Sequence, residues 1–214
     1  MSRLQFAPGK RGILKLLHVS FQGPPIDDPA TLATLPDDLR RLLSVVNGFI
    51  QFGGGLHVRG ACKAPDWHAL STVLSGDLAL AQLYPSVLPD DVPFAQDVFG
   101  DQFLLRQGVV HRLSGETGEV ESLQCSLFAF LESAQTNPID YLNLGQMARY
   151  FREGGDLQPG QLLSVWPPFC MEEAANGVSF RAISSLERLA FLAWFARQTR
   201  NLADGTTIEF KFVP

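Results

Sequence analysis

The chain has 214 residues, of which 46% are hydrophobic and 18% charged, and its formal net charge is −5. This composition excludes a disordered chain and allows a core without disulfides or metals, while the scattered basic residues do not favour nucleic-acid binding. Cys62, Cys125 and Cys170 form no CxxC pair, which predicts free, buried thiols in a reducing compartment. No secretion signal is recognisable and the apolar run 189–196 is too short to span a membrane, so we expect a cytoplasmic protein.

The first half of the chain predicts a helix followed by a strand. After a proline-rich link at 24–29, apolar residues recur at helical spacing over 35–46, and Asn47 and Gly48 suit a left-handed exit from that helix. Glycines 53–55 precede a short strand at 56–59, in which apolar and polar residues alternate. A second amphipathic segment follows at 66–74.

The middle of the chain predicts a β-meander. Strands are expected at 103–106, 109–113 and 120–123, separated by turns at Gln107-Gly108 and at 115–118. Ser126 then has the position of a helix N-cap before an apolar helical segment.

The last part of the chain predicts a further helix–strand block. We expect a helix at 139–151, a strand at 178–183, a helix at 186–199 opened by a Ser184–Glu187 capping box, and an alternating strand at 208–212. The helix at 186–199 is apolar on nearly all sides and needs cover on more than one of them. We therefore expect residues 138–214 to pack on the preceding domain.

An ordered series of motifs resembles the SUKH superfamily, also called the Smi–Knr-like domain. The matching positions are Leu35, Pro36, Leu39, Leu42, Asn47, Gly48, Phe94, Ala95, Asp97, Gly100, Phe103 and Phe130. The resemblance covers about residues 30–135 and implies an α+β fold, in which a mixed, largely antiparallel meander sheet has helices packed on one face. Residues 1–135 would form this domain, and residues 138–214 would be a C-terminal extension.

The resemblance also implies a function without catalysis or a cofactor. Many bacterial members resemble or serve as immunity proteins, which mask the toxin domain encoded beside them. We therefore expect a cytoplasmic, bacterial protein-binding module, monomeric or weakly dimeric, that neutralises a cognate polymorphic toxin. The partner-contacting residues vary between members, so the resemblance assigns none to this chain.

Several groups of residues have both a chemical and a structural interpretation. Glycines 53–55 have no phosphate-binding motif around them, which favours a turn. His57, His68 and His111 with Cys62 match no common zinc spacing, which favours isolated imidazoles and no metal. Cys125-Ser126 lacks a nucleophile motif, and the Asp97–Asp101 pair suits carboxylates that bond local backbone amides better than acid–base chemistry.

The remaining candidates are residues that contact a partner. Glu116, Glu119 and Glu121 form an acidic rim on the meander, suited to a basic toxin, and Trp67 is a candidate interface anchor. The predicted partner-binding set is Trp67, Asp97, Asp101, Glu116, Glu119 and Glu121. Two alternatives remain open: a small hydrolase or nucleotide-binding enzyme using glycines 53–55, Asp97, Asp101 and a histidine, and a regulatory scaffold protein.

Overall fold

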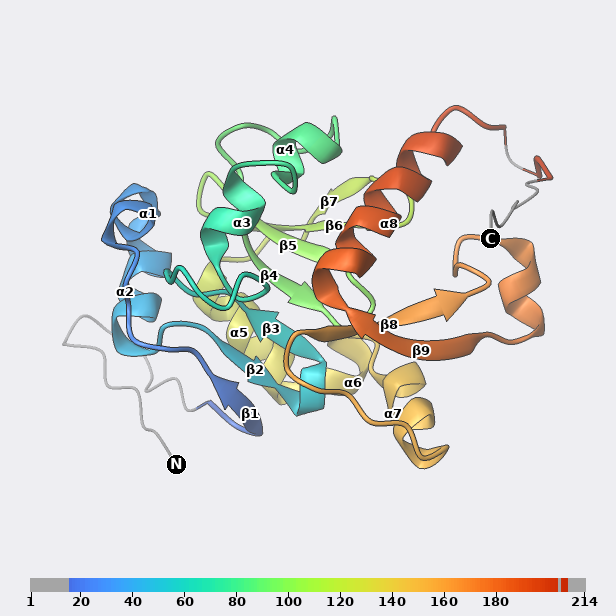
Figure 1. Ribbon diagram of the computed structural model, residues 1–214, viewed down its shortest axis with the longest axis horizontal. Coiled ribbons are helices and arrows are strands. Elements are labelled where there is room, and N and C mark those ends of the chain that lie inside the picture. Colours follow the sequence, from blue (N-terminus) through green and yellow to red (C-terminus); the bar gives the residue numbers. More distant parts are fainter. Residues whose placement is uncertain (1–15, 204, 208–214) are drawn as a thin grey trace.

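The fold is built on one seven-stranded antiparallel sheet (Figure 1). The computed structural model describes residues 16–203 and 205–207, so the strand predicted at 208–212 lies outside the described residues. The strands follow each other in space in chain order: β1 (Val19–Gln22), β2 (Phe49–Gln51), β3 (Leu56–Val58), β4 (Val92–Asp97), β5 (Gln102–Arg106), β6 (Val109–Leu113) and β7 (Val120–Ser122). The predicted meander, with its turn at Gln107-Gly108, is therefore confirmed.

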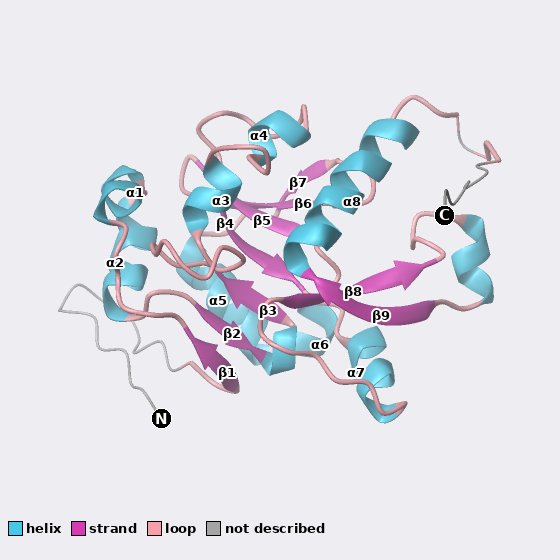
Figure 2. Ribbon diagram, viewed as in Figure 1, coloured by secondary structure: helices cyan, strands magenta, loops and turns pink. Residues whose placement is uncertain are grey.

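Helices cover both faces of this sheet (Figure 2). On one face α2 (Asp37–Val45) and α5 (Leu127–Thr136) share a core cluster with Phe103 and Leu105 of β5. On the other face α3 (Leu70–Leu74), α4 (Leu80–Leu83) and α8 (Ser185–Thr199) enclose Leu104, which lies between Phe103 and Leu105 in the sequence. The predicted α+β class is confirmed, but the expectation of helices on one face accounts for α2 and α5 alone, because alternate β5 residues are apolar on both sides.

The C-terminal block packs against the sheet. It contains α6 (Pro138–Tyr141), α7 (Gly145–Arg152) and a two-stranded sheet of β8 (Gln161–Trp166) and β9 (Ser179–Ser184). The amide of Leu163 donates to the carbonyl of Val98 at 2.8 Å, and Leu163 and Val165 belong to the main core cluster. The helix predicted at 139–151 is divided into α6 and α7, and Asn143 between them has a φ of +52°.

The helix ends show which predicted caps form. Ser126 caps α5 by accepting a hydrogen bond from the amide of Ala129 at 3.4 Å, as predicted. Ser184 precedes α8 but makes no capping hydrogen bond, so the predicted capping box does not form. Asp28 caps α1 (Pro29–Thr34), for which no helix was predicted. Within residues 16–203 and 205–207 no helix is long and apolar enough to cross a membrane.

Candidate functional site

A chain of buried polar side chains runs across β3, β4 and β5. Arg59, which follows β3, donates from Nη2 to the Oε1 atoms of Gln96 and Gln102, both at 2.7 Å, and from Nη1 to the carbonyl of Pro93 at 3.0 Å. Gln96 in turn lies 3.2 Å, Nε2 to Nδ1, from His57. All of these side chains are nearly inaccessible, so each hydrogen bond offsets a desolvation cost.

Two stacked histidines continue this chain, and their protonation follows from their partners. His68 Nε2 lies 3.0 Å from the carbonyl oxygen of Asn47, which only accepts, so that nitrogen carries the hydrogen. In the neutral ring Nδ1 of His68 is then an acceptor, and it receives the hydrogen bond from His57 Nε2 at 2.8 Å. His57 Nδ1 is left to accept from Gln96, whose orientation is set by Arg59.

The environment of the two rings favours this neutral state. Burial, then the neighbouring Arg59 and His68, hold the pKa of His57 well below 6.5. Burial also lowers the pKa of His68, although its bond to Asn47 acts in the opposite direction. Burial lowers the pKa of Arg59 to about 9. This value is still above neutral pH, so the guanidinium stays charged.

Glycines and Asn47 enclose His68. A Cβ on Gly23 would overlap both the Asn47 carbonyl oxygen and His68 Nε2, and one on Gly60 would lie 2.7 Å from the same nitrogen. The Asn47 side chain accepts from the amide of Ala61 at 2.7 Å and donates to the carbonyl of Pro24 at 2.9 Å. Asn47 therefore joins three segments, a tertiary role beyond the helix exit that the sequence predicts.

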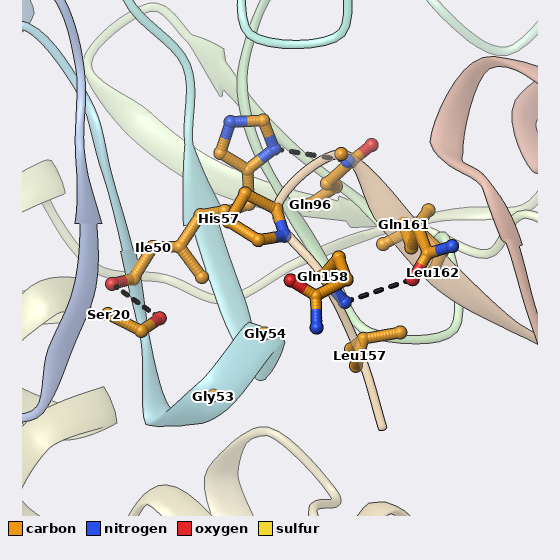
Figure 3. Close-up of a pocket in the computed structure, with 12 residues that line it drawn as sticks. Ser20, Ile50, Gly53, Gly54, His57, Gln96, Leu157, Gln158, Gln161 and Leu162 are labelled. Atoms are coloured by element: carbon orange, nitrogen blue, oxygen red, sulfur yellow. Dashed lines mark hydrogen bonds between the residues drawn. The ribbon is translucent and has the colours of Figure 1, made fainter. Parts of the chain in front are cut away.

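A small cavity of about 90 Å³ adjoins His57 (Figure 3). His57 and Gln96 lie on its sheet side, Gly53 and Gly54 lie below, and residues 157–161 form the opposite wall. The described lining carries no charged side chain: Ser20, Ile50, Gly53, Gly54, His57, Gln96, Leu157, Gln158, Pro159, Gly160, Gln161 and Leu162. The volume suits a few water molecules and is below the range of small-molecule sites, about 300–1,000 Å³.

Gly53, Gly54 and His57 line this cavity, but the aspartates proposed to act with them in an enzyme do not. Gly53 and Gly54 lie in a 3₁₀ turn, η1 (Phe52–Gly54), between β2 and β3, which confirms the predicted turn. Asp97 and Asp101 are not among the residues that line the cavity. Asp97 Oδ1 instead accepts hydrogen bonds from three successive backbone amides, those of Phe99, Gly100 and Asp101, at 2.9, 2.9 and 3.0 Å. The predicted bonding to local amides is thus confirmed for Asp97, whereas Asp101 accepts from the amide of Gly115, 14 positions away, at 2.9 Å.

Asp97 belongs to a second buried polar cluster, which is ionic. Arg112 pairs with Asp101 at 2.6 Å and with Asp97 at 3.5 Å. Burial, followed by the nearby Asp101, raises the pKa of Asp97 to about 7, although Arg112 and the amides oppose the shift. Glu116 accepts from the amides of Phe169 and Cys170, at 3.1 and 2.9 Å, and so ties the meander to the C-terminal block.

A second arginine of this cluster, Arg188, is incompletely paired. Arg188 of α8 is 1% exposed and donates from Nε to the carbonyl of Phe99 at 3.0 Å. Its Nη1 and Nη2 have no hydrogen-bond partner, and Nη2 lies 3.7 Å from Glu116 Oε1. The cluster holds α8 on the sheet with hydrogen bonds that are less complete than those of the histidine chain.

The predicted partner-binding residues do not form one surface. Asp97 and Glu116 are buried and occupied by their own chain, so their carboxylates are not offered to a partner. Glu119 and Glu121 are exposed, and their role stays a prediction. Trp67 is half-buried and packs on Phe21, His57 and His68, near β1 and β3.

The structure brings together only two of the metal-site candidates, His57 and His68. His111 lies on β6, where Nδ1 is 3.2 Å from the Val109 carbonyl, away from the His57–His68 pair. Among the described residues no group of three or more His, Cys, Asp or Glu side chains could hold a metal ion. The expectation of isolated imidazoles is wrong for His57 and His68, which are 11 positions apart and meet only through the loop before α3. No local spacing signals this pair.

The three cysteines are free, as predicted, but differ in exposure. Cys62 is buried, Cys125 is half-buried and Cys170 is exposed, so the expected burial is confirmed for Cys62 alone. Burial and nearby carboxylates raise the pKa of Cys62 to about 11, which makes it an unreactive thiol at neutral pH.

Net negative charge is concentrated in one part of the chain. Residues 64–148 contain eleven Asp or Glu residues and two basic residues, Arg106 and Arg112. Both arginines are engaged internally, Arg106 with Asp91 at 2.7 Å and Arg112 with Asp97 and Asp101. Seven carboxylates are exposed and form no ion pair with the described residues: Asp66, Asp77, Asp90, Glu119, Glu121, Glu132 and Asp140.

Comparisons with known proteins add little to this description. No protein-family model and no curated protein matches the chain. One similar solved structure is the crystal structure of Atu4351 from Agrobacterium tumefaciens, with 15% sequence identity and a TM-score of 0.48. The match covers 82% of this chain and 85% of that one.

Proposed function

We propose that this chain is a non-catalytic cytoplasmic protein that binds a basic protein, and that its partner is a cognate bacterial toxin domain. The observation that carries the proposal is the excess of exposed, unpaired carboxylates over 64–148, together with the internal pairing of both arginines in that segment. Such a surface attracts a basic partner and accelerates its encounter. The SUKH-like motif series supplies the more specific role of an immunity protein.

The best-defined part of this surface lies at the β7 end of the sheet. Ser86 Oγ donates to the carbonyl of Gly118 at 2.5 Å, and the hydroxyl of Tyr84 donates to that of Gly115 at 3.0 Å. These bonds join the 84–91 loop, which contains Asp90, to the β6–β7 turn, which leads to Glu119 and Glu121. We call these three residues the acidic surface. Trp67, four strands away over β1–β3, does not belong to it.

Co-expression with the product of the neighbouring reading frame tests the proposal. We expect a 1:1 complex and rescue of cells from that product, with the free protein monomeric or weakly dimeric in sizing experiments. Failure to bind the product, and failure to rescue the cells, would contradict the immunity role.

Charge reversal tests the acidic surface separately. The triple variant Asp90→Lys, Glu119→Lys, Glu121→Lys should lower the association rate at least about tenfold at low salt, with a weaker dependence on ionic strength. Asp66→Lys, Glu132→Lys, Asp140→Lys is the matched control, since it makes the same charge change at exposed positions elsewhere. Equal loss of rate in both triple variants would show that net charge, and not this surface, guides the partner.

A further inference from the structure

The His57–His68 contact has no place for an added proton. A proton on His68 Nδ1 would face the N–H of His57 Nε2, 2.8 Å away. A proton on His57 Nδ1 would face the amino group of Gln96 at 3.2 Å. Gln96 cannot reverse its amide without losing the bond from Arg59 to its Oε1 atom and turning its amino group toward the guanidinium. Either site therefore sets two donors against each other.

The groups that face the two rings do not compensate a positive charge. The facing charge next to β3 is that of Arg59, which follows the strand and is itself positive. The other facing elements contribute neutral groups: Ser20 and Phe21 from β1, Asn47 from the loop after α2, Trp67 from the loop before α3, Gln96 from β4, Gln158 and Gly160 from the segment before β8, and Gln161 from the start of β8. No carboxylate among the described residues hydrogen-bonds to either ring. Protonation must therefore separate the rings or bring one of them to water.

The two rings differ in their freedom to move. His68 is enclosed by the backbones of Gly23, Gly48 and Gly60, at which a Cβ would overlap or crowd its ring. His57 instead borders the cavity, across which residues 157–161 lie (Figure 3). We call residues 157–161 the strap. The strap lies close to Trp67, which packs on His57. A Cβ on Gly160 would lie only 2.8 Å from the indole nitrogen of Trp67.

We propose that the His57–His68 pair is a pH-sensitive latch, in which uptake of one proton turns His57 into the cavity and releases Trp67 and the strap from the sheet. His68 keeps its bond to Asn47, and the imidazolium of His57 reaches water and the glutamine side chains of the cavity wall. The rest of the sheet stays folded, since its core clusters are built from apolar side chains of other residues. The cavity widens at acidic pH and exposes the face of β1–β3. This latch does not depend on the proposed toxin partner.

NMR on the full chain tests the latch. At pH 7.5 we expect long-range ¹H–¹⁵N spectra to show both rings neutral, each with its hydrogen on Nε2. On titration below pH 6.5, the Trp67 indole signal and the amides of the strap should shift together with His57, while the far-UV circular dichroism stays unchanged. Titration of His57 near 6.5 without any change at Trp67 overturns the proposal, as does a Trp67 change that coincides with global unfolding.

Two variants separate the latch from general acid sensitivity. His57→Gln keeps an amide oxygen for Gln96 and an amide donor for His68 but cannot take up a proton, so the transition at Trp67 should disappear or move at least one pH unit lower. His111→Gln is the matched control, because His111 lies apart from the pair, and it should keep the wild-type midpoint. An unchanged midpoint in His57→Gln overturns the proposal. If His57→Gln does not fold, the wild-type titration decides alone.

Discussion

Two buried polar networks lie on the same sheet and solve the problem of burial differently. The histidine chain from Arg59 to Asn47 has one positive charge, and each of its contacts joins a donor to an acceptor. The ionic cluster around Arg188 combines three carboxylates, those of Asp97, Asp101 and Glu116, with two arginines. Two of its guanidinium nitrogens have no hydrogen-bond partner.

Because of this difference, the stability contributed by the two networks changes with pH in opposite directions. The histidines have pKa values below 6.5 in the folded state, so the unfolded chain binds more protons and stability falls as the pH decreases below 6.5. Asp97 has its pKa raised from 3.8 to about 7, so the folded chain binds more protons between these values. The stability that Asp97 contributes is complete below pH 3.8 and is lost as the pH rises toward 7.

The largest effect is expected from Gly23→Ala. Gly23 belongs to the cage around His68, which is formed by the backbones of Gly23, Gly48 and Gly60. The added Cβ overlaps backbone as well as the ring, so neither partner can yield easily, and we expect a loss of about 3 kcal/mol or more in the free energy of unfolding. Gly145→Ala is the control, because nothing lies within 4 Å of its Cβ and the residue begins a helix. Chemical denaturation measures both. Similar stability in the two variants would mean that the cage is not tight.

Arg59→Met tests whether the histidine chain depends on its charged end. The change leaves the acceptors of Pro93, Gln96 and Gln102 without their donor, and we expect a loss of about 2–3 kcal/mol. Gln96 also becomes free to turn, so the hydrogen on His57 should no longer be confined to Nε2 in ¹⁵N spectra. Arg181→Met, on an exposed position of β9, should change stability by less than about 0.5 kcal/mol. A single His57 tautomer in Arg59→Met would contradict the proposed direction of the chain.

Asp97→Asn tests the opposite pH response of the ionic cluster. The amide oxygen can still accept from the three backbone amides, but the titration of residue 97 is removed. The free energy of unfolding of the variant minus that of wild type should rise with pH, by up to about 1.4 kcal/mol per pH unit between pH 4 and 7. The difference should therefore be larger at pH 8 than at pH 5. Urea midpoints across this range measure the difference. Asp90→Asn, at an exposed position, should follow the wild-type curve, and the same curve for Asp97→Asn would refute the assignment.

The smallest effect is expected from Glu116→Gln at the contact between the meander and the C-terminal block. The two carboxylate oxygens accept from the amides of Phe169 and Cys170, whereas glutamine can accept with one oxygen, so we expect a loss of about 1 kcal/mol. Hydrogen exchange of these two amides should rise. Glu119→Gln, on the exposed side of the same turn, should leave both measurements unchanged.

Local spacing in the sequence was sufficient for the meander and for the alternation of residues 56–59. Turn residues and a two-residue period act over a few positions, so Gln107-Gly108 and the core side chains Leu56 and Val58 are found where they are predicted. The Asp97 turn is equally local, since its carboxylate bonds amides two to four positions ahead. These features need no knowledge of the rest of the chain.

Tertiary structure alone decided the histidine chain, the cover on the second face of the sheet and the exposure of Cys170. His57 and His68 meet because glycines at 23, 48 and 60 let three separate backbones close around one ring. The partners of Arg59 come from β4 and β5, more than 30 positions away. Spacing along the chain carries no information about such contacts, because their geometry depends on how the loops bring distant strands together.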